Sequence, residues 1–141
     1  MKEGLLHGTC VALNHKAVLI CGKPGVGKSS LALQLIDRGA TLISDDQTLL
    51  ILEEGVLVAM APPSLKGLME VRGVGICSFP YQERAELELC VDLCEGEPLE
   101  RLPELAFAEH HGLKVPLLKL QKDDPLGAIK VELKLGLSSS L

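Results

Sequence analysis

The sequence predicts an α/β fold in a single domain that covers residues 1–141. A chain of 141 residues is long enough to bury one hydrophobic core and short for two. Hydrophobic residues make up 47% of the chain and aromatic residues only 2%, and this largely aliphatic mixture suits helices packed on a sheet. An apolar run at 17–21 is followed, after a glycine-rich stretch, by a helical pattern at 29–38. The sequence therefore predicts a strand, a turn and a helix in that order.

The first elements follow from these patterns. Residues 17–21 form a continuous apolar run, which predicts a buried strand. Residues 29–38 carry leucine and isoleucine at spacings that predict a helix buried on more than one side, and Gly39 is a typical helix stop. Residues 41–44 predict a second short strand, which runs directly into Asp45 and Asp46.

The middle of the chain predicts a hairpin followed by a break. Apolar segments at 48–52 and 56–60 flank Glu53, Glu54 and Gly55, a composition typical of two strands joined by a tight turn. The two prolines within residues 61–64 interrupt regular structure.

The second half predicts two more strands and a closing helix. Residues 85–93 alternate between apolar and polar side chains, which predicts a half-buried antiparallel strand. Residues 95–105 are polar and contain proline, so we expect a loop there, and 113–120 predict another strand. A helix is expected at 125–134, with Pro125 near its first turn, and a frayed tail at 137–141.

A phosphate-binding motif links the first predicted strand to the first predicted helix. Residues 22–29 read G-K-P-G-V-G-K-S and match G-x-x-x-x-G-K-[ST] in full. Its glycines allow a tight turn whose N–H groups face an anion, Lys28 adds a charge for the β- and γ-phosphates, and Ser29 offers a hydroxyl to Mg²⁺. The alternative is a glycine-rich turn that binds nothing. The predicted nucleotide-binding residues are Gly22, Lys23, Pro24, Gly25, Val26, Gly27, Lys28, Ser29 and Ser30.

Two adjacent carboxylates, Asp45 and Asp46, follow the second predicted strand. Residues 22–29 form a P-loop motif, and a carboxylate at a strand end near it could hold Mg²⁺. A second carboxylate could accept a proton from an attacking hydroxyl. Neighbouring side chains on an extended chain point in different directions, which suits two roles. A simple turn is the alternative, because aspartate also favours turns.

Composition excludes several other classes of protein. The net charge of −5 and the few aromatic residues argue against a nucleic-acid partner. The longest apolar runs are strand-sized and no signal peptide is recognised, so neither a membrane span nor secretion is expected. The five cysteines lack a CxxC pair and fit buried, reduced thiols, which indicates a cytoplasmic protein. Cys90 and Cys94 could bind a metal in principle, but no third ligand follows at metal-ligand spacing.

The stretch from His7 to Gly75 resembles the catalytic domain of the HPr kinase/phosphorylase family, bacterial enzymes that phosphorylate a serine of the phosphocarrier protein HPr. The blocks that match are His7 with Gly8, residues 22–29, 31–36, 38–39 and 44–46, Ala61 with Pro62, and residues 70–75. The last block resembles the family's E-[IV]-R-G-x-G signature. The resemblance implies an α/β P-loop kinase domain with a mixed central sheet on which the P-loop helix packs. It resembles the short form seen in alphaproteobacteria and some other Gram-negative bacteria, which lacks the N-terminal domain of the longer enzymes.

The resemblance also implies roles for single residues. Asp45 matches the general base toward the serine hydroxyl, and His7 matches a histidine that contacts this aspartate. Asp46 and Glu70 match acidic positions of the metal site, where Ser29 also belongs. Lys28 and, by a weaker alignment, Arg101 match further active-site cations. The implied cofactors are ATP and Mg²⁺, the implied partner is an HPr-like phosphocarrier protein, and the implied assembly is a homo-oligomer, a hexamer in the longer enzymes.

Some positions depart from the family pattern. Ser30 and Ala40 stand where longer enzymes carry an acidic residue and a histidine, and residues 120–126 contain no arginine where the family has a basic P-G-R-N-type loop tied to phosphorolysis. The reverse, phosphorylase reaction is therefore an open question. Two other functions also stay open: a nucleotide-binding regulatory module with little kinase activity, and a P-loop kinase that acts on a small molecule.

Overall fold

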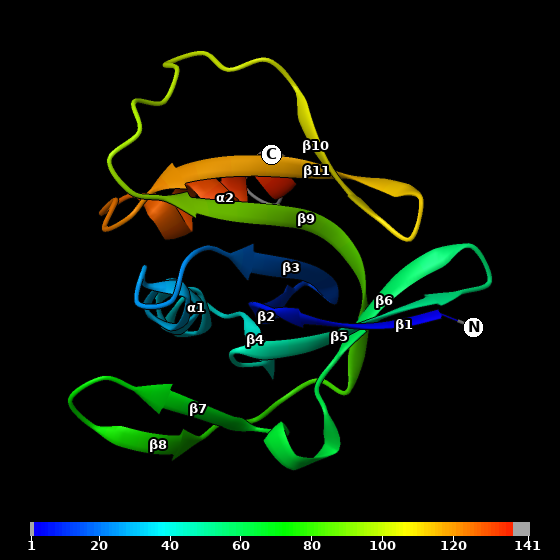
Figure 1. Cartoon of the computed structure of the whole chain (residues 1–141). Coiled ribbons are helices and arrows are strands. Elements are labelled where there is room, and N and C mark those ends of the chain that lie inside the picture. The colour runs from blue at the N-terminus through cyan, green and yellow to red at the C-terminus, as the bar shows by residue number, and fades with distance from the viewer. Residues whose placement is uncertain (1, 137–141) are drawn as a thin grey trace.

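The computed structural model describes residues 2–136 and shows one large mixed sheet with two helices beside it (Figure 1). The sheet has nine strands; seven follow the order β1-β5-β6-β9-β3-β2-β4, and β11 adds to β9 and carries β10. The strands are β1 (Lys2–His7), β2 (Thr9–Leu13), β3 (Lys16–Cys21), β4 (Thr41–Ser44), β5 (Gln47–Glu53), β6 (Val56–Met60), β9 (Arg84–Cys94), β10 (Ala106–His110) and β11 (Leu113–Gln121).

The longest strand, β9, lies at the centre of this sheet. It pairs parallel to β3 and to β11, and it pairs antiparallel only to β6. The prediction of an antiparallel strand at 85–93 is therefore wrong for two of its three partners. The alternation of apolar and polar side chains shows which face of a strand is buried, and it carries no information about the direction of the neighbouring strands.

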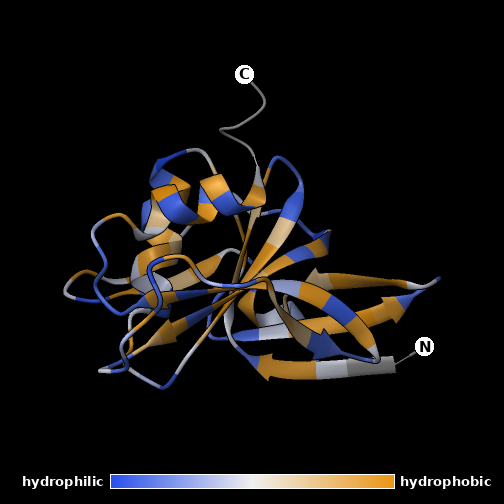
Figure 2. Ribbon diagram, turned by 90° about the horizontal axis from the view of Figure 1, so that it is seen from above, coloured by the Kyte–Doolittle hydropathy of each residue, from blue (hydrophilic) through white to orange (hydrophobic). Residues whose placement is uncertain are grey.

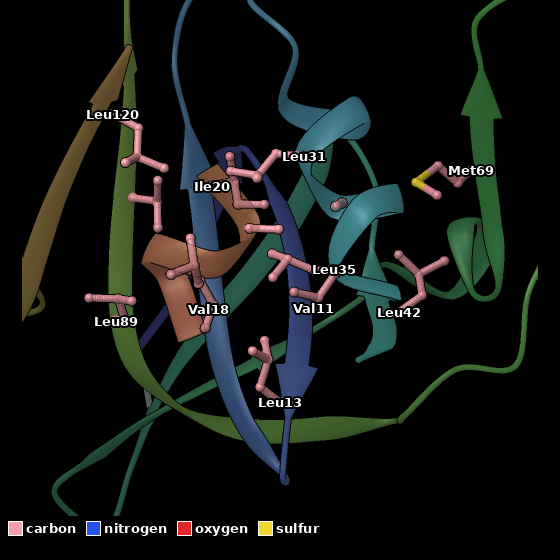
Figure 3. Packing of buried hydrophobic residues seen from close by; sticks show 14 residues of the cluster. Val11, Leu13, Val18, Ile20, Leu31, Leu35, Leu42, Met69, Leu89 and Leu120 are labelled. Carbon is pink, nitrogen blue, oxygen red and sulfur yellow. The ribbon is translucent and has the colours of Figure 1, made fainter. Parts of the chain in front are cut away.

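Helix α1 (Lys28–Asp37) covers one face of the sheet, and helix α2 (Gly127–Leu135) packs beside it. Leu31 and Leu35 of α1 point into a cluster formed with Val11 and Ile20 of the sheet (Figure 3). The predicted helix and the stop at Gly39 are confirmed, since Gly39 follows α1 with a φ of 111°. This cluster holds α1, the helix that follows the P-loop, against the sheet.

A second hydrophobic cluster fills the opposite side of the central strands. It includes Leu19, Ile43, Leu50 and Leu57, and the thiols of Cys10 and Cys90 belong to it. Hydrophobic residues are concentrated on the strands, while many connecting loops are hydrophilic (Figure 2). All five cysteines are free, as predicted, although Cys21 and Cys77 are only half-buried.

The predicted hairpin is present as β5 and β6, and its turn places Glu54 and Gly55 at φ values of 50° and 82°. The two prolines predicted to interrupt regular structure lie at the start of a short 3₁₀ helix, η1 (Pro63–Leu65). The predicted closing helix begins at Gly127, two residues after Pro125, and the predicted tail at 137–141 lies outside the described residues. No helix within residues 2–136 is long and apolar enough to span a bilayer.

A separate two-stranded sheet was not predicted. It consists of β7 (Leu68–Val71) and β8 (Gly75–Ser78), which pair antiparallel around a turn at Gly73. This hairpin lies on the far side of α1 from β9 in Figure 1. Met69 of β7 packs into the hydrophobic cluster that α1 forms with the sheet. It was missed because both strands have only four residues and β8 is exposed on both faces, so no period stands out.

Candidate active site

The P-loop runs from the end of β3 to the start of α1, as predicted. Gly22 has a φ of 155°, and a Cβ placed there would lie 2.7 Å from Cγ1 of Val26 and 3.1 Å from the carbonyl oxygen of Leu93. Only a glycine fits between these neighbours. Gly25 and Gly27 also have positive φ values, 79° and 105°, and no atom lies within 4 Å of their Cβ positions. Gly22 is therefore required by packing, and the other two glycines by backbone conformation.

The start of α1 offers free amide groups to an anion. The first hydrogen bond of the helix runs from the N–H of Leu31 to the carbonyl of Gly27, at 3.0 Å. The N–H groups of Lys28, Ser29 and Ser30 precede that bond, and helical geometry gives them no acceptor within the helix. Together with the helix dipole they form a phosphate-binding cradle.

Lys28 folds back over the loop that precedes it. Its Nζ donates hydrogen bonds to the carbonyl oxygens of Gly22 at 3.0 Å and Lys23 at 3.2 Å. Both acceptors belong to the P-loop, so the ammonium group lies above the cradle. This is the position in which a cation can meet phosphate oxygens bound to the loop.

Asp45 connects the start of α1, where the P-loop ends, to strands β2 and β7. Its Oδ1 accepts hydrogen bonds from Oγ of Ser29 at 2.5 Å and from Oγ1 of Thr9 at 3.0 Å. Its Oδ2 accepts one from the N–H of Glu70 at 3.2 Å. The side chain is only 8% exposed. The carboxylate that follows β4 is thus held by α1, β2 and β7, which fixes its position relative to the cradle.

Asp46 has a different environment from its neighbour. Its φ of 67° lies in the left-handed region, and its backbone is held there by hydrogen bonds from the N–H of Gly8 to its carbonyl and from its N–H to Oγ1 of Thr9. Its side chain is exposed. The two carboxylates are thus differently placed, with Asp45 buried and Asp46 exposed, but a turn at Asp46 separates them and not the extended chain that was predicted.

The cradle and the acidic pair face one cavity of about 670 Å³. Positive charge comes from Lys28, Arg72 and Lys122, and negative charge from Asp45, Asp46 and Glu70, while Asp123 lies at the rim shared with a neighbouring cavity. Such a mixture suits a phosphate chain with a divalent cation. The described residues contain no group of three or more His, Cys, Asp or Glu side chains that could hold a metal by themselves. Mg²⁺ commonly takes only one or two carboxylates and completes its shell with water and phosphate oxygens, so the oxygen donors at this end of the cavity fit it.

Two of the predicted catalytic residues lie apart from this cavity. His7 is exposed at the end of β1, where it pairs with Gln47, and its side chain does not line the cavity. The adjacent Gly8 does contact the pair, since its N–H donates a hydrogen bond to the carbonyl of Asp46. Arg101 is exposed in the loop between β9 and β10 and does not line the cavity either.

Three residues of the site were not assigned a role from the sequence. Thr9 is fully buried and holds both aspartates, yet it looks like an ordinary strand residue in the sequence. Arg72 enters from the β7–β8 turn, and its place in the signature block was its only signal. Lys122 lies in the segment after β11 and forms an ion pair with Glu95 at 2.9 Å, which raises the pKa of Lys122.

Comparison with known proteins gives a consistent result. The HPr Serine kinase C-terminal domain family matches residues 1–121. The HPr kinase/phosphorylase of Lactobacillus acidophilus is 34% identical over 117 residues, which are 77% of this chain and 36% of that protein. The enzyme of the same name from Malacoplasma penetrans is 30% identical over 155 aligned positions, covering 97% of this chain and 52% of that protein. The chain thus spans between 36% and 52% of the length of these two relatives.

A solved structure, the Hpr(Ser) kinase/phosphatase from Coxiella burnetii, matches the fold with a TM-score of 0.81 at 25% sequence identity. The match covers 96% of this chain and 99% of that one. The predicted α/β fold, a mixed sheet with the P-loop helix packed on it, is confirmed.

Proposed function

Because this chain belongs to the HPr Serine kinase C-terminal domain family, we propose that it transfers the γ-phosphoryl group of ATP, in the presence of Mg²⁺, to a serine of an HPr-like phosphocarrier protein. One observation carries the proposal: the hydrogen bond from Ser29 to Asp45 joins a complete phosphate cradle to a carboxylate pair within one cavity. Phosphoryl transfer needs a positioned phosphate, neutralised charge and a group that orients the nucleophile, and this cavity provides residues for each.

The phosphates would lie against the free amides of Lys28, Ser29 and Ser30, with the Lys28 ammonium above them. Ser29, Asp46 and Glu70 are the proposed metal residues, and Mg²⁺, when bound, would neutralise charge on the phosphate oxygens. Arg72 and Lys122 bring further positive charge to the same cavity, where charge on the transferred group spreads over its oxygens.

For the proton of the serine hydroxyl, the family resemblance proposes Asp45 as the acceptor. Its Oδ2 receives a single hydrogen bond, from Glu70, and so has room for another donor. Asp45 accepts a hydrogen bond from Ser29, a proposed metal residue, and this contact favours a second assignment. In it, Asp45 helps to hold the metal and the exposed Asp46 accepts the proton. Substitution of each aspartate separates the two assignments. For His7 and Arg101 the proposal rests on the resemblance alone.

The test is a transfer assay with labelled ATP, Mg²⁺ and HPr from the same organism. Label on a serine of HPr supports the proposal. Nucleotide binding without transfer to any acceptor supports a regulatory module instead, and transfer only to a metabolite supports a small-molecule kinase. A second reaction with phosphoserine-HPr and inorganic phosphate tests phosphorolysis, whose product would be pyrophosphate. We take the protein to be cytoplasmic because its cysteines fit reduced thiols, and homo-oligomeric as the resemblance implies.

A further inference from the structure

A second cavity, of about 320 Å³, adjoins the phosphate cradle. It lies between the first turn of α1, the ends of β9 and β11, and the segment that leads into α2. The two cavities share the residues at their junction: Val26, Gly27, Ser30, Gln34 and Asp123. A ligand whose phosphates lie on the cradle can therefore extend past the Ser30 amide into this space without crossing any element of the fold.

The walls of the second cavity combine aliphatic and polar side chains. Leu31 and Leu120 are buried core residues that show one side to the cavity, and Leu93 faces it from the end of β9. Ligand pockets of this kind combine apolar walls with a few polar groups that fix orientation. Aliphatic walls with a polar rim suit a flat heterocycle better than a second phosphate group.

Only part of the polar rim is free to bind a ligand. Asp124 already accepts hydrogen bonds from the N–H of Leu126 at 2.8 Å and from Nζ of Lys130 at 2.6 Å, and Gln121 donates to the carbonyl of Glu97. By contrast, the side chains of Gln34 and Asp123 make no hydrogen bond or ion pair within residues 2–136. The side chains free to bind within residues 2–136 are thus the Asp123 carboxylate, which only accepts, and the Gln34 carboxamide and Ser30 hydroxyl, which donate and accept.

We propose that this second cavity binds the base of the phosphoryl donor, that the base is a purine with an exocyclic amino group, and that Asp123 accepts a hydrogen bond from that group. The proposal rests on the proposed function, since it requires a nucleotide on the cradle. A carboxylate accepts a hydrogen bond from the exocyclic amino group of adenine or guanine, a donor that hypoxanthine lacks, while Gln34 can serve the neighbouring ring atoms. Asp123 sits at a φ of 63°, so its carboxylate is presented by a constrained turn.

The experiment compares Mg²⁺-dependent binding of ATP, GTP, ITP and inorganic tripolyphosphate by titration calorimetry. The wild-type protein should bind ATP or GTP about tenfold more tightly than ITP, the effect of one hydrogen bond to a charged group. Whichever of ATP and GTP is tighter identifies the base. Asp123→Asn keeps a residue that tolerates the left-handed conformation and can donate to the carbonyl of ITP, so the preference over ITP should fall to about threefold or less.

Asp37→Asn is the matched control, because Asp37 is an exposed aspartate at the other end of α1 and lines neither cavity. It should leave the preference unchanged. Equal binding of ATP, GTP and ITP by the wild-type protein overturns the proposal, as does an Asp123→Asn variant that strengthens tripolyphosphate and all nucleotides alike, which would be a general charge effect. Failure of the wild-type protein to bind even tripolyphosphate counts against the proposed function itself, so the two failures are distinguishable.

Discussion

Ser29 on helix α1 and Asp45 after strand β4 lie 16 residues apart in the chain, yet the hydroxyl of one donates a 2.5 Å hydrogen bond to the carboxylate of the other. This bond joins the residue expected to hold a metal to the residue expected to accept a proton. The hydrogen bond therefore fixes the position of the carboxylate relative to the phosphate cradle.

Asp45→Asn should retain nucleotide binding and lose phosphoryl transfer. Loss of a general base typically lowers the rate by about 10² to 10⁴, whereas the cradle that binds phosphate stays intact. Binding of a fluorescent nucleotide and transfer to HPr are the two measurements. Asp46→Asn is the paired variant: if it loses transfer in this way while Asp45→Asn mainly raises the Mg²⁺ requirement, the roles are exchanged. Transfer at the wild-type rate in both variants would mean that neither residue is the base.

Lys28→Ala should weaken nucleotide binding and abolish transfer, because it removes the ammonium group held over the P-loop by Gly22 and Lys23. Lys16→Ala is a suitable control. Lys16 is an exposed lysine at the opposite end of β3 from the loop, so its loss changes the net charge equally without touching the cavity. Equal effects of the two substitutions on nucleotide affinity would show that only overall charge matters.

Thr9→Val should lower both the stability and the rate of transfer. The buried hydroxyl donates to Asp45 and accepts from the N–H of Asp46, so its loss leaves a buried donor and a buried acceptor short of a partner, at a cost of about 1–3 kcal/mol. Thr9→Ser keeps the hydroxyl and should restore the rate. Thr9 is a positioning residue, so the loss should fall mainly on kcat and little on the KM for ATP. A Ser variant as slow as the Val variant would contradict this role.

Gly22→Ala should disrupt the P-loop more than Gly25→Ala. The added Cβ at position 22 would meet Val26 at 2.7 Å and the Leu93 carbonyl at 3.1 Å, whereas nothing lies within 4 Å at position 25. Both changes carry backbone strain of about 1–2 kcal/mol, but only the first adds a clash with the end of β9. Urea unfolding and nucleotide binding should rank the variants as wild type, Gly25→Ala, Gly22→Ala.

Stability should fall as the pH rises above about 9, because burial raises the pKa of the Cys10 thiol well above its usual range and that of Cys90 to about 12. In the unfolded chain these thiols lose their protons near 9, so the native state binds more protons above that pH and is destabilised. Cys10 alone contributes about 1.4 kcal/mol for each pH unit above 9. Urea unfolding at pH 8 and pH 10.5 should show a smaller drop for Cys10→Ala than for the wild type, and Cys77→Ala, on the partly exposed hairpin, should keep the full drop.

Much of this architecture could be predicted from local sequence. The strand at 17–21, the helix after it and the hairpin around Gly55 each have a distinct period or turn, and all three are present. The direction of β9 could not be predicted, because pairing with β3 and β11 depends on the path of the whole chain. The P-loop was predictable for the same reason as the helix, since its residues are contiguous.

The rest of the cavity could not be found in this way. Thr9, Arg72 and Lys122 come from three separate parts of the chain and carry no local pattern. Glu70 was recognised only through the family signature, and its main link to the site in the structure is a backbone N–H, which any residue type would supply. Side chains that converge only after folding have no sequence signal of their own.

Strand β3, which carries the P-loop, has β2 as its neighbour on one side and β9 on the other. β2 directly precedes it, but β9 begins only at Arg84, far along the chain. During synthesis, a nascent chain that ends after α1 holds the whole P-loop motif without the strand against which Gly22 packs. Pairing between distant segments requires closure of a long loop and is slow. The contact between Gly22 and Leu93 can therefore form only once β9 has been synthesised, so the phosphate site depends on a strand far beyond its own motif.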